Sequence, residues 1–486
     1  MTSATLKDAP LAADAEGEPL YAAARRIYPQ KVSGAFRRLK WLLLVLTLGI
    51  YYLLPFVRWH RGPSEPTQAV LVDLAHRRFY FFFIELWPQE VYYFTGLLIL
   101  AALILFLMNA VAGRLWCGYL CPQTVWTDLF MAVERLIEGD RRERMRKDAG
   151  PLTLERLTEK LLKHSIWLAI AWWTGGAWVL YFADAPTLVV QLATFSAPMV
   201  AYGAIAVLTF TTYVLAGHMR EQLCLYMCPW PRIQAALTDE NALNVTYRYD
   251  RGEPRYSLKK AELLRATDQP AGDCIDCGQC VVVCPTGVDI REGANLGCIQ
   301  CGLCIDACDT VMHKVGRPPR LIAYDTDINI KRRSAGLEPI YRLLRPRTLL
   351  YSALIALIGA VMILALFERA EYGIAVIHDR NPLYVRLTDG AVRNGYTVRF
   401  VNKEGEMRRF ELKVSGLEDA IVEIVGTEHD LSGREIIEVG PDQTREVRVL
   451  VSTRTKQKDA SVPLTFTTID ENGALAASVK DFFRSP

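Results

Sequence analysis

Two cysteine runs in the middle of the chain constrain its fold more than any other feature. Both runs have the spacing C-x2-C-x2-C-x3-C. The first comprises Cys274, Cys277, Cys280 and Cys284, and the second comprises Cys298, Cys301, Cys304 and Cys308. This spacing is typical of cubane iron–sulfur centres, because three thiolates on one loop bind three irons and the fourth cysteine ligates the neighbouring cluster. The doubled pattern therefore predicts two [4Fe–4S] clusters.

Crossed ligation of this kind predicts two ligand sets. One cluster is expected to bind Cys274, Cys277, Cys280 and Cys308, and the other to bind Cys298, Cys301, Cys304 and Cys284. Zinc prefers well-separated C-x2-C pairs, and disulfides need an oxidising compartment, so both alternatives fit the pattern less well. Asp309 stands where Pro285 stands after the first run, a departure that leaves the ligand set complete. Neighbouring clusters pass single electrons, so we expect this chain to move electrons.

Apolar stretches elsewhere in the chain are long enough to cross a membrane. Hydrophobic residues make up 51% of the 486 residues, which is high for a soluble protein, and a membrane helix needs about 20 apolar residues. We predict five spans, namely Trp41 to Val57, Val91 to Ala112, Ser165 to Phe182, Pro198 to Ala216 and Thr348 to Phe367. The fold class is therefore a polytopic α-helical membrane protein carrying a two-cluster, ferredoxin-like domain.

Basic residues predict the orientation of these spans. Lys and Arg are dense before the first span, between the second and third, and before the fifth, whereas residues 183–197 contain neither. Because cytoplasmic loops carry the excess of Lys and Arg, we expect the N-terminus and both clusters in the cytoplasm of a bacterium, with the spans in its inner membrane. The net charge of +3 hides this asymmetry, and no nucleic-acid partner is expected.

This orientation divides the chain into five regions. Residues 1–40 are expected to be a partly disordered cytoplasmic N-terminus, 41–217 a four-helix membrane region, and 218–346 the cytoplasmic cluster domain, followed by the fifth span at 347–368 and a periplasmic domain at 369–486. All twelve cysteines lie between Cys117 and Cys308, and none falls in the exported region, where thiols tend to form disulfides.

The four remaining cysteines form an internal repeat, Cys-x-Tyr-x-Cys-Pro. Cys117 and Cys121 follow the second predicted span, and Cys224 and Cys228 follow the fourth. A residue before proline avoids the α region, so Cys121 and Cys228 are expected at breaks that precede new interfacial helices. Four thiols at one membrane depth fit Cu(I), a dithiol–disulfide couple or a redox relay, while buried cysteine can also act as a small hydrophobe.

Other polar residues are weaker candidates. His218 and Met219 precede the second pair, and His60 and His76 lie between the first two spans, where they are secondary candidates for metal binding. Asp128 and Glu134, after the first pair, are expected to mark the wet face of a helix rather than a proton path.

The region after Ile374 has the period-two pattern of strands with one buried face. The clearest runs are Tyr396 to Val401, Phe410 to Val414, Ile421 to Val425, Glu446 to Val451 and Pro463 to Thr467. About seven such runs predict a C-terminal immunoglobulin-like β-sandwich. It contains no recognisable catalytic constellation, so we expect it to dock a partner.

In the order of its motifs, nearly the whole chain resembles the CcoG family of cytochrome c oxidase accessory proteins, also called FixG or RdxA. Its membrane part is also similar to NapH- and NosR-type electron-transfer proteins. The CcoG resemblance implies reduction of Cu(II) to Cu(I) at the cytoplasmic face in support of cbb-type oxidase assembly. Cys117, Cys121, Cys224 and Cys228 would then bind or reduce copper. Implied partners are a copper chaperone, a copper-exporting ATPase and oxidase assembly factors, and a homo-oligomer is compatible with this role.

Two other functions remain open. An electron-transfer subunit would pass charge between a cytoplasmic or quinone pool and a membrane partner without holding copper. A redox-sensing assembly scaffold would depend on the C-terminal sandwich rather than on the cluster ligands. Neither the electron donor nor a nucleotide-binding G-x-G-x-x-G fingerprint can be identified in the sequence.

Overall fold

A computed structural model describes residues 26–486, except for 63–64, 405, 427–435, 442, 456, 458, 471–472 and 486. Of the N-terminus predicted to be partly disordered (residues 1–40), residues 1–25 lie outside this range. The chain divides into two compact units. The first contains residues up to Val57, Val70–Phe79 and Leu86–Ala356, and the second contains Arg58–Ala69, Tyr80–Glu85 and Leu357–Pro486.

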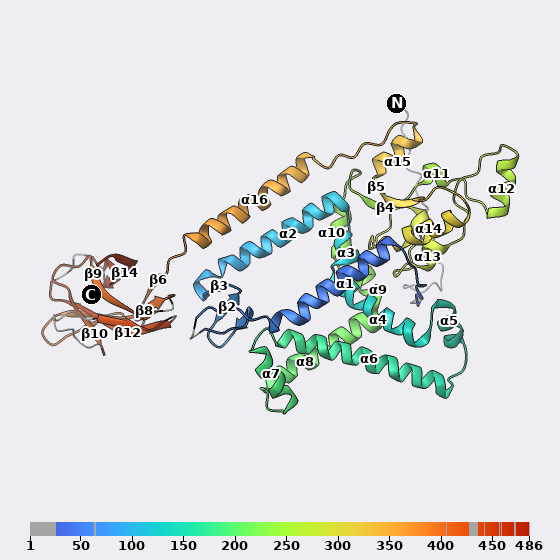
Figure 1. The fold of residues 1–486 in the computed structure, drawn as a ribbon. Coiled ribbons are helices and arrows are strands. Elements are labelled where there is room, and N and C mark those ends of the chain that lie inside the picture. Colours follow the sequence, from blue (N-terminus) through green and yellow to red (C-terminus); the bar gives the residue numbers. More distant parts are fainter. Residues whose placement is uncertain are drawn as a thin grey trace, which may run out of the picture. The chain divides into compact units, whose positions relative to one another are not determined.

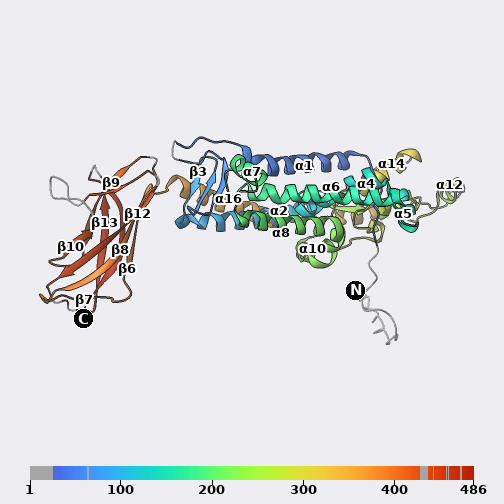
Figure 2. The same cartoon turned by 90° about the horizontal axis from the view of Figure 1, so that it is seen from below.

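Long helices, all largely apolar except α6, make up the membrane part of the first unit (Figures 1 and 2). They are α1 (Ala35–Leu53), α2 (Tyr92–Ala112), α6 (Leu154–Val179), α8 (Met199–Thr212) and the first half of α16 (Pro346–Phe367). α8 packs along α6 and is followed directly by η3 (Tyr213–Met219), α9 (Arg220–Gln222) and η4 (Leu223–Met227), with a non-helical φ of 42° at Arg220. Within the described residues, four segments are long and apolar enough to cross a membrane: Ala35–Phe56, Tyr92–Ala112, Met199–Met227 and Pro346–Phe367.

The spans differ from the sequence-based prediction in two places. The predicted third span is part of α6, a helix whose first half carries charged residues and which is not among the four apolar segments. The fourth apolar segment does not end at Ala216 but runs on to Met227, because two π-helical stretches, η3 and η4, extend α8. The second cysteine pair therefore begins inside the end of this helix, not after it.

Shorter elements link these helices. They are η1 (Leu54–Phe56), β1 (Val70–Asp73), β2 (Arg78–Phe81), β3 (Ile84–Leu86), η2 (Pro88–Glu90), α3 (Leu115–Tyr119), α4 (Pro122–Glu138), α5 (Arg141–Ala149), α7 (Ala185–Ala193) and α10 (Trp230–Leu237). α4 begins at Pro122, and Pro229 forms the N-cap of α10. Cys121 and Cys228 both have extended backbones, so the predicted breaks before two new helices are confirmed.

The cluster region is built around a two-stranded antiparallel sheet. β4 (Asn244–Tyr247) pairs with β5 (Ile322–Asp325), and the other elements are α11 (Tyr249–Gly252), α12 (Leu258–Ala266), α13 (Gln279–Val282), η5 (Ile290–Glu292), α14 (Leu303–Lys314) and α15 (Asp327–Ser334). Cysteines from both runs belong to the buried core of this region, together with Val245, Met312 and Ile322. The side chains that would bind the clusters are thus also those that hold the region together.

The second unit contains two antiparallel sheets around one core (Figure 2). One has the order β10 (Ile421–Val425), β12 (Gln443–Thr453), β8 (Val392–Asn402), β6 (Tyr372–His378), with β7 (Val385–Arg386) also paired to β8. The other has the order β11 (Ile436–Val439), β9 (Arg408–Ser415), β13 (Ser461–Ile469), β14 (Leu475–Arg484). Tyr396 and Phe400 of β8 meet Phe410 and Phe466 of the second sheet. All five runs predicted from period-two alternation are strands.

Candidate electron-transfer centre

Two neighbouring cavities in the first unit are each surrounded by cysteine thiols. One is lined by Cys274, Cys277, Cys280 and Cys308. The other is lined by Cys284, Cys298, Cys301 and Cys304, and Cys280 reaches it as well. The fourth cysteine of each run therefore lies with the first three of the other run, which is the crossed arrangement that a two-cluster protein needs.

These cavities fit cubane clusters rather than single ions. Among the described residues, no three His, Cys, Asp or Glu side chains converge closely enough to hold one metal ion. The predicted set of four cysteines lines each cavity, which matches the four thiolates that a cubane takes, one to each iron. Burial raises the pKa of Cys298 and Cys308 to about 12, and a metal that binds these thiols would displace their protons.

The two runs adopt the same unusual backbone. Gly278 and Gly302 occupy the left-handed region at φ 66° and 73°, and each begins the short helix that carries the third cysteine of its run. Two residues earlier, Asp276 and Gln300 also have positive φ, at 53° and 56°. Glycine tolerates such angles at little cost. This repeated turn is how a spacing of two residues directs three thiols towards one cavity.

The repeated membrane-edge pairs also share one backbone conformation. Gly113 (φ 53°, ψ −126°) lies four residues before Cys117, and Arg220 (φ 42°, ψ −117°) lies four residues before Cys224. The amide of Cys121 donates to the carbonyl of Trp116 at 3.0 Å, and that of Cys228 donates to the carbonyl of Leu223 at 2.8 Å. The repeat seen in the sequence is therefore a structural repeat, although only one copy has glycine at the strained position.

The fold brings these four thiols together. Burial raises the pKa of Cys117 to about 12, and the neighbouring thiols of Cys121, Cys224 and Cys228 add to that shift. The thiol of Cys117 also approaches Gln234 Oε1 at 3.4 Å. Because Gln234 is buried on α10, directly after the second pair, this contact ties one pair to the other. We call these four cysteines the thiol quartet.

The thiol quartet lies against the loop that carries Cys301. A Cβ on Gly118 would lie 2.7 Å from the carbonyl oxygen of Ile299 and 3.0 Å from Cα of Cys301. The hydroxyl of Tyr119 donates to the carbonyl of Cys301 at 3.0 Å. The backbone between Cys117 and Cys121 is thus in direct contact with the second cavity.

Two buried cations interact with both the thiol quartet and the cysteines of this cavity. The Arg114 guanidinium interacts with both Cys117 and Cys298, and its backbone amide donates to Gln300 Oε1 at 2.8 Å. The Lys40 ammonium, whose residue is 3% exposed, interacts with both Cys224 and Cys301. Positive charge at these positions favours thiolates and added electrons on either side.

Close contact at Gly118 leads to a test. We expect Gly118→Ala to destabilise the protein by about 1–3 kcal/mol, because the added methyl meets backbone atoms that cannot move aside. Gly176→Ala is the matched control, because a Cβ at this helical position has open space and alanine favours helix. Thermal unfolding of both variants measures the difference. An equal effect of the two substitutions would contradict the close packing.

The histidines and carboxylates considered in the sequence analysis have surroundings that differ from those predicted. His218 stacks against His164, with 5.8 Å between ring centroids, and packs on Tyr213, so it faces an aromatic cluster. His76 Nδ1 lies 2.7 Å from Asp73 Oδ2. The predictions for Asp128 and Glu134 were wrong, because both carboxylates are buried at 1% and 0% exposure in ion pairs with cations from distant segments.

Comparison with known proteins supports the same reading of the chain. Three family models match, described as "4Fe-4S binding domain" (residues 94–138), "4Fe-4S dicluster domain" (residues 219–327) and "IG-like fold at C-terminal of FixG" (residues 362–486). The first match includes Cys117 and Cys121, and the second includes the remaining ten cysteines.

Relatives of known name align over most of the chain. The nitrogen fixation protein FixG of Rhizobium meliloti is 48% identical over 460 residues, covering 89% of this chain and 87% of its own. Protein RdxA of Cereibacter sphaeroides is 54% identical over 402 residues, covering 82% and 84%. Protein RdxB of the same organism is 52% identical over 416 residues, covering 85% and 87%. With four apolar helices and its 4Fe-4S domains, this chain belongs to the FixG/RdxA family of membrane iron–sulfur oxidoreductases.

Proposed function

We propose that this protein reduces Cu(II) to Cu(I) at the thiol quartet, with electrons drawn from two [4Fe–4S] clusters. The observation that carries the proposal is the contact between Gly118 and the Cys301 loop. This contact supports the proposal, because the segment between Cys117 and Cys121 touches a loop that lines a cavity surrounded by cysteines. Thiolates stabilise Cu(I) more than Cu(II), so a quartet of thiols favours the product of the reaction.

The ligands follow from the two cavities. Cys274, Cys277, Cys280 and Cys308 would hold one cluster, and Cys284, Cys298, Cys301 and Cys304 the other. When bound, the clusters supply single electrons. The reduction of each copper ion consumes one electron, so the stoichiometry needs no paired transfer. The source of electrons is a reductant outside this chain.

The residues of this chain have separate roles in the proposed reaction. Cys117, Cys121, Cys224 and Cys228 bind copper as thiolates and release protons as they do so. Arg114 and Lys40 are positioning residues, since their charges stabilise the negative site. The hydrogen bonds of Arg114 to Gln300 and Pro231 also hold the two regions together. Gln234 keeps the two halves of the quartet in contact.

Membrane topology completes the proposal. We infer that α6 supplies a fifth crossing through residues 165–182, which leaves both cysteine regions in the cytoplasm and residues 369–486 in the periplasm, as the distribution of Lys and Arg favours. The C-terminal region, as an immunoglobulin-like sandwich, would dock an oxidase assembly factor. Cu(I) would pass to a chaperone and an exporting ATPase for the assembly of a cbb-type oxidase.

An electron relay without copper is the second candidate. It is favoured by the contact between Gly118 and the Cys301 loop, which electron transfer needs whether or not the thiols hold copper. In this case the quartet would still have to contact the Cys301 loop.

Anaerobic titration with Cu(II) separates the two functions. We expect copper to reoxidise the dithionite-reduced clusters and Cu(I) to appear on a chelator. A Cys117→Ala/Cys121→Ala/Cys224→Ala/Cys228→Ala variant should keep its iron but lose at least about tenfold in rate, because soft ligands are removed from the site. Unchanged reduction in this variant would exclude the quartet as the copper site. Reduction no faster than with free reductant in either protein would favour the relay.

A further inference from the structure

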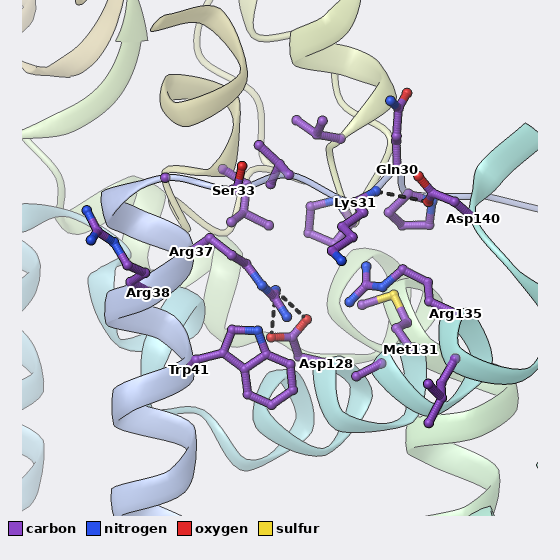
Figure 3. A pocket seen from close by; sticks show the side chains of 18 residues that line it. Gln30, Lys31, Ser33, Arg37, Arg38, Trp41, Asp128, Met131, Arg135 and Asp140 are labelled. Atoms are coloured by element: carbon purple, nitrogen blue, oxygen red, sulfur yellow. Dashed lines mark hydrogen bonds and ion pairs between the residues drawn. The ribbon is translucent and has the colours of Figure 1, made fainter. Parts of the chain in front are cut away.

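A large cavity in the first unit is not used by the proposed reaction (Figure 3). Its volume is about 720 Å³, within the range of about 300–1,000 Å³ that is common for small-molecule sites. One wall is the segment before α1 together with the first turns of that helix, and the opposite wall is α4. Val283, Pro285 and Leu303 contribute the side next to Cys284 and Cys304.

The walls of this cavity are held in place by specific contacts. The carboxylate of Asp306, on α14, accepts hydrogen bonds from the amides of Phe36 and Arg37 at 3.2 and 2.8 Å, which caps α1. The amide of Gln30 donates to the carbonyl of Val282 at 3.0 Å. The amide of Lys31 donates to Asp140 Oδ1 at 3.0 Å. The cavity is therefore a built feature of the fold.

Cations outnumber carboxylates inside it. Figure 3 shows the side chains of Lys31, Arg37 and Arg135 directed towards the middle of the cavity, with Asp128 facing Arg37. The negative charge of Asp128 is already paired, because Arg37 Nη1 lies 2.9 Å from both of its oxygens and Lys40 Nζ lies 3.8 Å from one.

The remaining cations lack a close counter-charge. In the part of the chain that the structure describes, neither the Lys31 ammonium nor the Arg135 guanidinium forms an ion pair. Burial and the nearby Arg37 both lower the pKa of Arg135, whereas Asp128 and Asp140 raise it only in part. An anion beside Arg135 would relieve the unfavourable charge at that guanidinium, and Lys31, which is exposed, would supply a second cation for it.

The rest of the lining is apolar and aromatic. Trp41 forms the floor, with the Arg37 guanidinium 4.9 Å from the centre of its ring, and Met131, Ala132 and Leu136 lie on α4. The cavity also lies at the first turns of α1, where the apolar sequence begins, a depth at which Trp, Lys and Arg meet lipid headgroups. Arginine forks match phosphate oxygens particularly well.

We propose that this cavity binds a phosphate group carried by an amphiphilic molecule, next to the Cys284 loop. The phosphate would lie between Lys31 and Arg135, and the apolar or aromatic body of the ligand would lie on Trp41 and α4. Two sources share this chemistry: the headgroup of an anionic lipid and a soluble phosphate-bearing ring such as flavin mononucleotide. The inference goes beyond the proposed function and does not depend on copper.

Binding to the full-length protein in nanodiscs distinguishes these sources. Flavin mononucleotide is compared with riboflavin, which lacks the phosphate, by quenching of flavin fluorescence. Phosphatidylglycerol is compared with phosphatidylcholine by native mass spectrometry of retained lipid. If the protein binds flavin mononucleotide more tightly than riboflavin, the ligand of the cavity is a soluble phosphate compound. If it retains phosphatidylglycerol but not phosphatidylcholine, the ligand is a lipid headgroup. Absence of both preferences overturns the proposal.

A matched pair of variants links binding to the cavity. We expect Lys31→Ala/Arg135→Ala to weaken the preferred ligand roughly ten- to hundredfold, because two charge-assisted contacts are lost. Arg142→Ala/Arg146→Ala removes the same charge from exposed positions on α5 and should leave binding unchanged. Iron content and melting temperature confirm that both variants fold. An equal loss in the two variants would mean non-specific attraction to positive charge and would overturn the assignment.

Discussion

Replacement of Cys308 by alanine should remove about half of the bound iron, and the lost cluster should be the one held by the other cysteine run. Cys308 lines the cavity that contains Cys274, Cys277 and Cys280, and these three thiols are its electrostatic neighbours. Without its fourth thiolate a cubane is exposed to loss of iron. The iron content of anaerobically purified protein and the electron paramagnetic resonance of its reduced clusters measure this effect.

Double variants separate crossed ligation from ligation within one run. If ligation is crossed, Cys277→Ala/Cys308→Ala removes two ligands of one cluster and keeps about half of the iron, whereas Cys301→Ala/Cys308→Ala damages both clusters and loses nearly all of it. If each run binds its own cluster, these two results exchange. The comparison is therefore decisive without knowing which cluster gives which signal. Thermal unfolding is needed as a control, because the cysteines also belong to the buried core.

Local sequence patterns predicted the parts of this protein that depend on local geometry. Cysteine spacing predicted which thiols share a cavity, because the turn at Gly278 recurs at Gly302. Proline predicted the breaks at Cys121 and Cys228, since it acts on the residue directly before it. Alternation predicted the C-terminal strands, because a pleated strand buries every second side chain. In each case the physical cause acts over a few residues.

Contacts between distant segments could not be predicted in this way. Lys40 looked like one of several topology-determining charges, yet it is buried beside Cys224 and Cys301, more than a hundred residues away. Gly118 is unremarkable in sequence, and only the neighbouring Ile299 carbonyl explains it. Arg220 has the same unusual backbone angles as Gly113, its counterpart in the repeat. An arginine gives no sign of such a conformation in the sequence, so the match is seen only when the two structures are compared.

Buried charge was the other source of error. Glu134 was predicted on a wet helix face, because an isolated carboxylate is rarely buried. The structure instead surrounds it with Arg144, Lys163 and Arg220, which come from α5, α6 and α9. A buried carboxylate is stable only when tertiary structure brings cations to it. The residues next to Glu134 in the sequence do not indicate which cations these are. The many arginines of α5 do predict that some carboxylate lies nearby, but the sequence does not indicate which carboxylate pairs with them.

Loss of the Glu134 charge should be the most destabilising single substitution in the membrane-edge region. The residue is 0% exposed, Arg144 Nη2 lies 2.7 Å and Arg220 Nη2 2.9 Å from its Oε2, and Arg144 is itself 1% exposed. Glu134→Gln keeps the shape but leaves these cations without their central counter-charge. We expect a loss of about 3–5 kcal/mol in the free energy of unfolding. Thermal unfolding in detergent measures it, and Glu155→Gln, at an exposed carboxylate on α6, is the control.

The effect of Glu134→Gln should depend on pH and should reach the thiol quartet. Burial alone would raise the pKa of Glu134, but Arg220 and Arg144 more than offset it and hold the pKa below its ordinary value of 4.5. The stabilisation is thus complete above that value and is lost as the pH falls through the lowered pKa, so wild type and variant should converge only in strong acid. Because Arg220 precedes Cys224 by four residues at positive φ, alkylation of Cys224 should accelerate in the variant. Glu134→Leu/Arg144→Met should recover part of the stability, since it also removes the guanidinium nearest to Glu134 and leaves only Arg220 without this partner, while Lys163 keeps its ion pair with Glu138. If Glu134→Gln is as stable as wild type at neutral pH, the ion pairs contribute little.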